Sequence, residues 1–252
     1  LACSLGFFFY TTMDAIDGGQ ARRTKSSSPL GQLFDHGCDG ILSGVLPIFQ
    51  MHAFGIGITP KLPILIGVTQ TLFFLGMWEE KYTGVCRTTI LGVIGTTEFM
   101  LFFVVHQFIA GFFAVDFSSY LLLVTVAGAV VSLMTTIVNT VSKCPLSATR
   151  ELVAITFFNL IFSCANYSTV SPYLVQSFTN GFLIIRMIFS SMSKTEFQSM
   201  QWIVIVPIVC IFWMSEVAMN AWLVMLSAFL IFYFAKICLE ISVSDLFQSK
   251  AK

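Results

Sequence analysis

Charged residues are scarce in this sequence. Its 252 residues include 13 Lys and Arg and 13 Asp and Glu, so 10% are charged, whereas soluble domains carry roughly 25%. The formal net charge is zero, so no basic surface points to nucleic acid and we expect no nucleic-acid partner. Hydrophobic residues make up 56% of the chain, and the mean hydropathy is +0.86. This balance excludes an ordinary soluble core and predicts an all-α polytopic membrane protein.

The motifs of common nucleotide and metal sites are lacking as well. No G-x-G-x-x-G, Walker loop or H-E-x-x-H occurs. The seven cysteines are scattered, and none forms a C-x-x-C pair. We therefore expect reduced thiols packed among apolar residues, with neither a zinc site nor a disulfide framework. The cysteines are Cys3, Cys38, Cys86, Cys144, Cys164, Cys210 and Cys238.

Nine apolar stretches are candidate membrane spans, since a spanning helix needs about 20 mostly apolar residues. Turn-forming stretches such as "SSSP" and "KCPLS" separate them, and we interpret residues 1–252 as one membrane domain. The chain starts without Met on "LACSLGFFFY", which reads as a helix already under way, so we expect an N-terminal segment before it. The expected spans are 1–24, 29–54, 62–82, 91–114, 119–142, 151–168, 172–193, 202–218 and 220–241.

Lys and Arg are distributed unevenly between alternate loops. Ten of them fall on one side of the nine expected spans, and only Lys61 falls in a loop on the other side. Cytosolic loops carry the excess of Lys and Arg, so the basic side should face the cytosol. The ten are Arg22, Arg23, Lys25, Lys81, Arg87, Lys143, Arg150, Lys194, Lys250 and Lys252.

One stretch departs from the apolar pattern: "DAIDGGQARRTKSSSPLGQLFDHGCDG", residues 14–40, holds four aspartates. Asp14 and Asp17 are spaced i, i+3 at the end of the first expected span. Asp35 and Asp39 are spaced i, i+4 at the start of the second, so each pair shares a helix face. The connecting loop is short. The two helices should therefore be antiparallel neighbours whose carboxylates converge about two turns inside the cytosolic boundary.

Four ionised aspartates at one depth in a membrane would repel one another strongly. A cation must neutralise them, and hard carboxylate oxygens favour Mg²⁺ or Mn²⁺. Four carboxylates suit two such ions, and the neighbouring glycines leave room for the close approach of a ligand. Arg22 lies about one turn nearer the cytosol, where it can meet a phosphate. The residues thus predict a two-metal phosphoryl-transfer site and disfavour a purely structural role.

The stretch matches the pattern D-x2-D-G-x2-A-R-x8-G-x3-D-x3-D at every fixed position. It therefore resembles the CDP-alcohol phosphotransferase family. The longer sequence segment "DAIDGGQARRT…SPLGQLFDHGCD" is similar to the eukaryotic choline and ethanolamine phosphotransferases within that family. The matching residues are Asp14, Asp17, Gly18, Ala21, Arg22, Gly31, Asp35 and Asp39.

The resemblance implies that the protein transfers phosphocholine or phosphoethanolamine from CDP-choline or CDP-ethanolamine to diacylglycerol, releasing CMP. It also implies about ten transmembrane helices in the full-length protein, an endoplasmic reticulum or Golgi membrane, dependence on Mg²⁺ or Mn²⁺, and a homodimer. By resemblance, Asp14, Asp17, Asp35 and Asp39 hold two metal ions, and Gly18, Ala21, Arg22 and Gly31 bind the cytidine diphosphate. The less favoured alternative for Arg22 is a positive-inside anchor, and the two roles can coexist.

Two further residues are candidates for taking a proton from the diacylglycerol hydroxyl. His36 neighbours Asp35, and the competing role for it is to orient a metal ligand. Glu98 in span 91–114 should lie at the depth of the aspartates, and its alternative is a buried neutral carboxyl. We expect His36 and Glu98 to act together, one receiving the proton and the other orienting or relaying it.

Acidic residues also end the third expected span, in "MWEEKYTG". Glu79 and Glu80 are expected to be solvated charges at the helix end. The alternative is that one of them approaches the headgroup amine, with Trp78 and Tyr82 as cation–π partners.

Three other functions compete with this interpretation. The first is a member of the same family that uses CDP-diacylglycerol and a soluble alcohol. The sequence segment "ARRT…SPLG…LFDHGCD" disfavours this function. The second is a membrane cation carrier that uses intramembrane carboxylates. Such a carrier would need a path of carboxylates across the membrane, whereas the acids of this sequence cluster on one side. The third is a catalytically silent scaffold, in which at least one aspartate should be lost.

Overall fold

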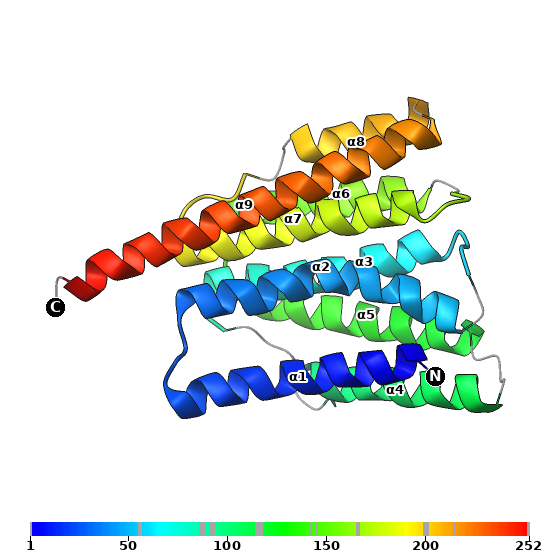
Figure 1. Ribbon diagram of the computed structural model, residues 1–252, viewed down its shortest axis with the longest axis horizontal. Helices are drawn as coiled ribbons and strands as arrows, with labels where there is room; N and C mark the ends of the chain where they lie inside the picture. Colours follow the sequence, from blue (N-terminus) through cyan, green and yellow to red (C-terminus); the bar gives the residue numbers. More distant parts are fainter. Residues whose placement is uncertain are drawn as a thin grey trace.

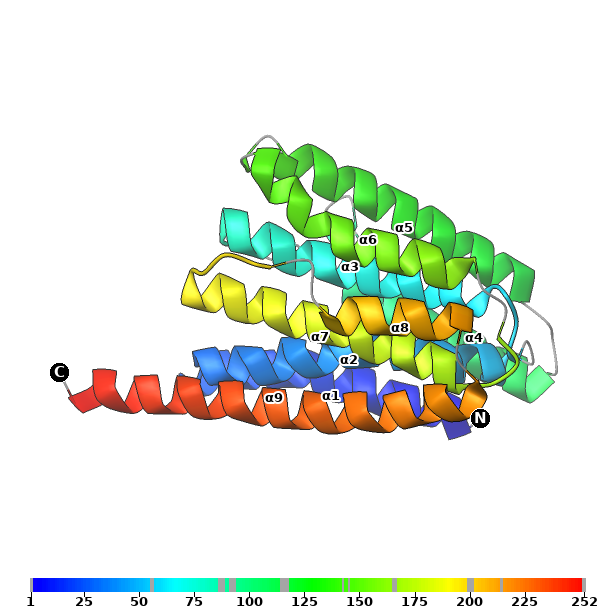
Figure 2. The same ribbon diagram turned by 90° about the horizontal axis from the view of Figure 1, so that it is seen from above.

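The computed structural model describes a bundle of helices that lie roughly along one axis (Figure 1). The bundle is elongated, and its C-terminal helix extends beyond the others at one end (Figure 2). The described residues are 2–54, 57–85, 89–90, 94–113, 118–141, 143–144, 146–164, 167–198, 202–213 and 215–250.

Nine α-helices occupy this part of the chain, in close agreement with the nine expected spans. A 3₁₀ turn, η1 (Leu146–Thr149), precedes α6, and two antiparallel two-residue strands, β1 (Thr89–Ile90) and β2 (Ile94–Gly95), precede α4. The helices are α1 (Ala2–Thr24), α2 (Pro29–Ala53), α3 (Leu62–Thr83), α4 (Thr96–Phe113), α5 (Ser118–Val141), α6 (Arg150–Ser163), α7 (Ser171–Ser193), α8 (Trp202–Trp213) and α9 (Glu216–Lys250).

Four helices deviate most from the expected bounds. Helix α6 ends at Ser163 and not at 168, and α8 ends at Trp213 and not at 218, because α9 already begins at Glu216. Strand β2 lies within the span expected at 91–114, and α4 begins only at Thr96. The span expected at 220–241 is a longer helix that runs to Lys250. The tight link between α1 and α2 agrees with the sequence: Ser28 caps α2 by accepting a hydrogen bond from the Gly31 amide, with Pro29 in the first helical turn.

Helix α7 lies at the centre of the bundle and packs against α2, α3 and α9. Its contacts with α2 and α3 include a buried network of side-chain amides. Gln70 donates hydrogen bonds to the carbonyls of Gly40 (3.2 Å) and Ser177 (2.8 Å). Asn180 donates to Gln70 Oε1 (2.9 Å) and to Asn159 Oδ1 (2.7 Å). This network joins α2, α3, α6 and α7 where hydrocarbon alone would not fix their register.

Glycines on α2 allow that close packing. A Cβ atom added at Gly40 would lie 2.5 Å from Ile184 Cγ2 of α7, a side chain that is fully buried. A Cβ at Gly44 would collide with the Gln70 amide. On α7, a Cβ at Gly181 would lie 2.8 Å from Ile41 Cγ1. Helix α2 is therefore seated against α7 with little room for adjustment.

Two described helical segments are long and apolar enough to cross a membrane, Leu62–Thr83 and Glu216–Ser242. This agrees with a membrane protein, while the number of spans stays a prediction. Odd-numbered α-helices end and even-numbered ones begin at the same end of the bundle (Figure 1). Basic residues occur at that end, including Arg22 and Arg23 in the last turn of α1 and Lys81 in the last turn of α3. Its cytosolic orientation stays a prediction.

The thiols are free where the structure describes them, as expected. Cys38 and Cys164 are exposed, which differs from the expected packing among apolar residues. Cys86 and the side chain of Cys210 lie outside the described part. The other free cysteines are Cys3, Cys144 and Cys238.

Replacing Gly40 by alanine tests the α2–α7 contact. We expect Gly40→Ala to destabilise the protein by about 1–3 kcal/mol, because the new methyl group must displace Ile184 in a filled core. Thermal unfolding in detergent, followed by tryptophan fluorescence, measures the effect. Gly6→Ala is the matched control, because a Cβ at Gly6 meets nothing within 4 Å. A melting temperature of Gly40→Ala equal to that of Gly6→Ala would contradict the tight-packing argument.

Candidate metal centre

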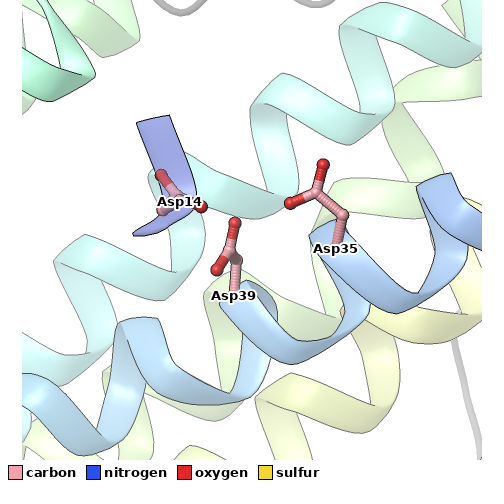
Figure 3. Close-up of side chains that lie close together, drawn as sticks. All are labelled: Asp14, Asp35 and Asp39. Atoms are coloured by element: carbon pink, nitrogen blue, oxygen red, sulfur yellow. The ribbon is translucent and has the colours of Figure 1, made fainter. Parts of the chain in front are cut away.

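Three aspartates from α1 and α2 come together between the two helices. Asp14 lies on α1, while Asp35 and Asp39 lie one helical turn apart on α2. One carboxylate oxygen of each lies within 4.8 Å of the other two. Their side chains point toward one another (Figure 3), and all three residues are partly buried. The convergence expected of the two helices is therefore present for these three residues.

The group fits a hard divalent cation. Its donors are carboxylate oxygens alone, and three carboxylates this close repel one another unless a positive charge lies among them. Two ligands of one Mg²⁺ ion lie at most about 4.2 Å apart, since each Mg–O distance is 2.0–2.1 Å. Small side-chain movements would bring the three oxygens to that spacing. Asp14, Asp35 and Asp39 could thus hold a metal ion.

Asp17 lies outside this group of three. It is exposed, and three residues of helix place it about 4.5 Å beyond Asp14 toward the basic end. It is close enough to interact electrostatically with Asp35 and Asp39. We expected all four aspartates to share one depth. Three of them come together, and Asp17 lies at the outer edge of the group.

A tyrosine that the sequence reasoning missed connects α1 to α2. The Tyr10 hydroxyl donates a 2.5 Å hydrogen bond to Asp39 Oδ1. Tyr10 precedes Asp14 by four residues, so both side chains lie on the same face of α1. That i, i+4 spacing was the available signal. The bond orients the Asp39 carboxylate within the group of three.

His36 lies beside the group on α2. Its Nε2 is 3.9 Å from Asp35 Oδ2, and its side chain is about a quarter exposed. Its Nδ1 is buried and has no hydrogen-bond partner among the described residues. This position suits either of the expected roles, proton acceptor or orienting group.

Glu98 is exposed in the first turn of α4, which packs against α1. The two helices run antiparallel (Figure 1), and the Ser4 hydroxyl donates to the Val104 carbonyl at 3.2 Å. Both Glu98 and Asp14 lie on the side of this contact that faces the basic end of the bundle. At 1.5 Å per residue, Glu98 is about 9 Å from the contact along α4, and Asp14 is about 15 Å from it along α1. Their depths therefore differ by about 6 Å. Glu98 is exposed, unlike the buried carboxyl considered as its alternative.

The residues expected to bind the nucleotide line the basic end of the same two helices. Arg22 is exposed and folds back on α1, so that its Nη1 lies 3.5 Å from where a Gly18 Cβ would be. Ala21 is partly exposed beside it. Gly31 also has a structural role, because its amide closes the Ser28 cap at 3.1 Å.

The expectation for the end of α3 is wrong. Glu79 is 1% exposed, so it is not a solvated end charge. Glu80 accepts a 2.6 Å hydrogen bond from Gln32 Nε2 of α2. Trp78 is also buried and donates to the Ala148 carbonyl, and the Lys81 ammonium pairs with Glu151 Oε1 of α6 at 2.7 Å. These residues tie α3 to α2 and α6, which the pattern of the span alone did not reveal.

Comparison with known proteins agrees with the motif. The family model described as CDP-alcohol phosphatidyltransferase matches residues 1–138, more than half of the 252 residues. This range contains the three converging aspartates, Asp17, His36 and Glu98.

Similar proteins include cholinephosphotransferases. Cholinephosphotransferase 1 of Danio rerio is 37% identical over 115 residues, which are 45% of this chain and 29% of that protein. Cholinephosphotransferase 1 of Xenopus laevis is 41% identical over 102 residues, 40% of this chain and 25% of that protein. An uncharacterised CDP-alcohol phosphatidyltransferase class-I family protein 2 of Dictyostelium discoideum is 32% identical over 186 residues, 66% of this chain and 44% of that protein.

The matched regions therefore span less than half of each relative. Within that limit, the motif, the helices that carry it and the family match all point the same way. The chain belongs to the CDP-alcohol phosphatidyltransferase family.

Proposed function

We propose that this protein transfers phosphocholine, phosphoethanolamine or both from the CDP-alcohol to diacylglycerol, yielding phosphatidylcholine or phosphatidylethanolamine and CMP. The observation that carries the proposal is the convergence of Asp14, Asp35 and Asp39 inside the family motif. Relatives named cholinephosphotransferases favour an amino-alcohol donor.

Asp14, Asp17, Asp35 and Asp39 would together hold two Mg²⁺ or Mn²⁺ ions. When bound, such ions neutralise the charge of a diphosphate and orient its phosphorus for in-line attack. Arg22 would contribute a planar fork to the phosphate oxygens, and Gly18 and Ala21 leave a face of α1 without bulk on which a nucleotide can lie. Tyr10 would keep Asp39 in place through its hydrogen bond.

In the proposed reaction, the diacylglycerol hydroxyl oxygen bonds to the phosphorus that carries the amino alcohol. The bond from that phosphorus to the CMP oxygen breaks, and CMP leaves. The hydroxyl proton passes to His36 Nε2 or to the Glu98 carboxylate, and the other group orients or relays it. The aspartates are poorer proton acceptors, since metal ions would occupy their lone pairs.

We propose further that the protein crosses an endoplasmic reticulum or Golgi membrane several times, with the aspartates near the cytosolic side. Basic residues at the ends of α1 and α3 support this orientation. A homodimer is proposed from the family resemblance.

A second candidate is a phosphatidyltransferase that uses CDP-diacylglycerol and a soluble alcohol. The description of the matching family favours it, because that description names phosphatidyl transfer. The same aspartates would serve either donor, so only a substrate test separates the two.

Purified protein incubated with diacylglycerol, Mg²⁺ and each CDP-alcohol in turn provides that test. We expect release of CMP with CDP-choline, CDP-ethanolamine or both, measured by chromatography. Release of CMP with neither, together with turnover of CDP-diacylglycerol and an alcohol, would favour the second candidate.

Removing one carboxylate charge tests the metal assignment. We expect Asp35→Asn and Asp39→Asn each to abolish turnover, because an amide lacks the charge needed beside a divalent cation. The same changes should remove the rise in melting temperature that Mn²⁺ causes in the wild-type protein. Glu216→Gln, an exposed acid at the far end of the bundle, is the matched control and should keep both properties. An Asp35→Asn protein with normal activity at all Mg²⁺ concentrations would show that the assignment is wrong.

Substitutions at the two candidate proton acceptors test their role. His36→Ala and Glu98→Gln should each lower kcat at least about tenfold, since general-base help is worth about 10²–10⁴-fold. Binding of the CDP-alcohol should change little. The double variant should be little slower than the slower single variant, because residues that act as a unit are not additive. If Glu98→Gln keeps the wild-type rate and pH profile, Glu98 takes no part and His36 must act alone.

A further inference from the structure

An apolar groove lies between α1, α2 and α4, with a volume of about 200 Å³. Gly6 and Phe7 of α1 form one wall, Leu46 and Phe49 of α2 form another, and Gln107 of α4 lies against both. None of these residues belongs to the candidate metal centre.

The groove runs away from the aspartates along the same two helices. Gly6 precedes Asp14 by eight residues and Leu46 follows Asp39 by seven, so the groove begins about 10–12 Å from the carboxylates at 1.5 Å per residue. The direction is away from the basic end of the bundle. Tyr10 lies between the two sites: it donates to Asp39 and stacks on Phe7, with ring centroids 6.3 Å apart.

The groove opens to the side of the bundle. Gly6 is exposed, and Phe49 is 56% exposed. Leu5 and Phe9, next to the groove on α1, are 64% and 63% exposed. In a membrane such a surface faces lipid tails, so a hydrocarbon chain can enter sideways.

The far end of the groove is polar. Gln50 of α2 lies about 16 Å from Asp39 along the helix. Gln107 follows Val104, the hydrogen-bond partner of Ser4, by three residues, so it lies about 4.5 Å farther from the aspartates along the bundle. Gln107 is 3% exposed, and its Oε1 has no hydrogen-bond partner among the described residues. Hydrocarbon cannot satisfy an amide oxygen, so these two side chains disfavour a chain that extends beyond the apolar walls.

We propose that this groove holds one acyl chain of the diacylglycerol and sets the chain length that the enzyme prefers. The proposal rests on the proposed function, which places the diacylglycerol hydroxyl at the aspartates. The chain would pass Tyr10, lie between Gly6 and Leu46, and end at the two glutamines. Each methylene removed from such a contact weakens binding about fourfold, so a blocked groove penalises long chains and spares short ones.

Filling the groove at Gly6 tests this assignment. A Cβ at Gly6 meets nothing within 4 Å, so Gly6→Phe should fold like the wild type while its ring occupies the space of the chain. We expect kcat/KM for dioleoylglycerol to fall about tenfold, and kcat/KM for dioctanoylglycerol to change less than about threefold. Leu5→Phe, on the lipid-facing side of the same helix turn, is the matched control and should keep the wild-type ratio. Equal loss with both lipids, at an unchanged melting temperature, would overturn the proposal.

A second variant tests the polar end of the groove, and its expected effect on chain-length preference is opposite to that of Gly6→Phe. Gln107→Leu removes an amide whose Oε1 has no partner among the described residues, so it should shift the preference toward longer chains without lowering the melting temperature. A chain-length preference equal to that of the wild type in both Gly6→Phe and Gln107→Leu would overturn the assignment.

Photo-crosslinking separates this proposal from the proposed function. Diacylglycerol with a diazirine in one acyl chain should label groove residues of the wild type, and Gly6→Phe should lose the label. Equal labelling by phosphatidylglycerol with the same chain would mean that the groove holds any membrane lipid, and would overturn the proposal. Specific labelling without CMP release from any CDP-alcohol would support the groove and refute the proposed function.

Discussion

The close contact of α2 with α7 is the constraint on which the arrangement of the site depends. Gly40 of α2 lies so near Ile184 of α7 that even a methyl group would collide. Gln70, between them, donates to the Gly40 carbonyl and crosses to α7 at Ser177. Hydrocarbon packing alone fixes a helix weakly in a membrane, because lipid tails are as apolar as the core. Glycine contacts and buried amide bonds supply the register that packing lacks.

That register determines where the carboxylates stand. Asp35 and Asp39 occupy the face of α2 that turns toward α1, while Gly37, Gly40 and Gly44 occupy faces that meet α9, α7 and α3. A rotation of α2 that displaced the aspartates would therefore also disrupt its close contacts with α9, α7 and α3. Helix α1 is held differently: it packs chiefly against α4 and reaches the site through the Tyr10–Asp39 bond. The two halves of the candidate metal centre thus lie on α2, which is seated tightly against α7, and on α1, which packs mainly against α4.

Much of this arrangement could be predicted from the sequence. Apolar length and turn residues gave α2 and α7 to within a residue or two, and the spacing of Asp35 and Asp39 gave their common face. The pairing with Asp14 followed from the short loop.

What could not be predicted depends on partners far away in the chain. Glu79 looks like a helix-end charge because nothing local shows that the other helices cover it. Gln70 looks like any polar residue in a span until its partners on α2 and α7 are known. Asp17 shares a spacing with Asp14 that suggests a common site, yet three residues do not complete a helical turn and leave it at the exposed edge.

Along the space between α1 and α2, polarity changes in steps. Arg22 is exposed at the basic end, the partly buried aspartates follow, and the apolar groove continues beyond Tyr10. This order matches the proposed reactants, since a nucleotide is polar throughout while diacylglycerol is polar only at its glycerol end. Each reactant would then be aligned by the part of it that does not react, so that binding energy from the acyl chain positions the hydroxyl for attack. The partial burial of the aspartates fits this proposed arrangement, because the point where the two reactants would meet lies at the boundary between polar and apolar surface.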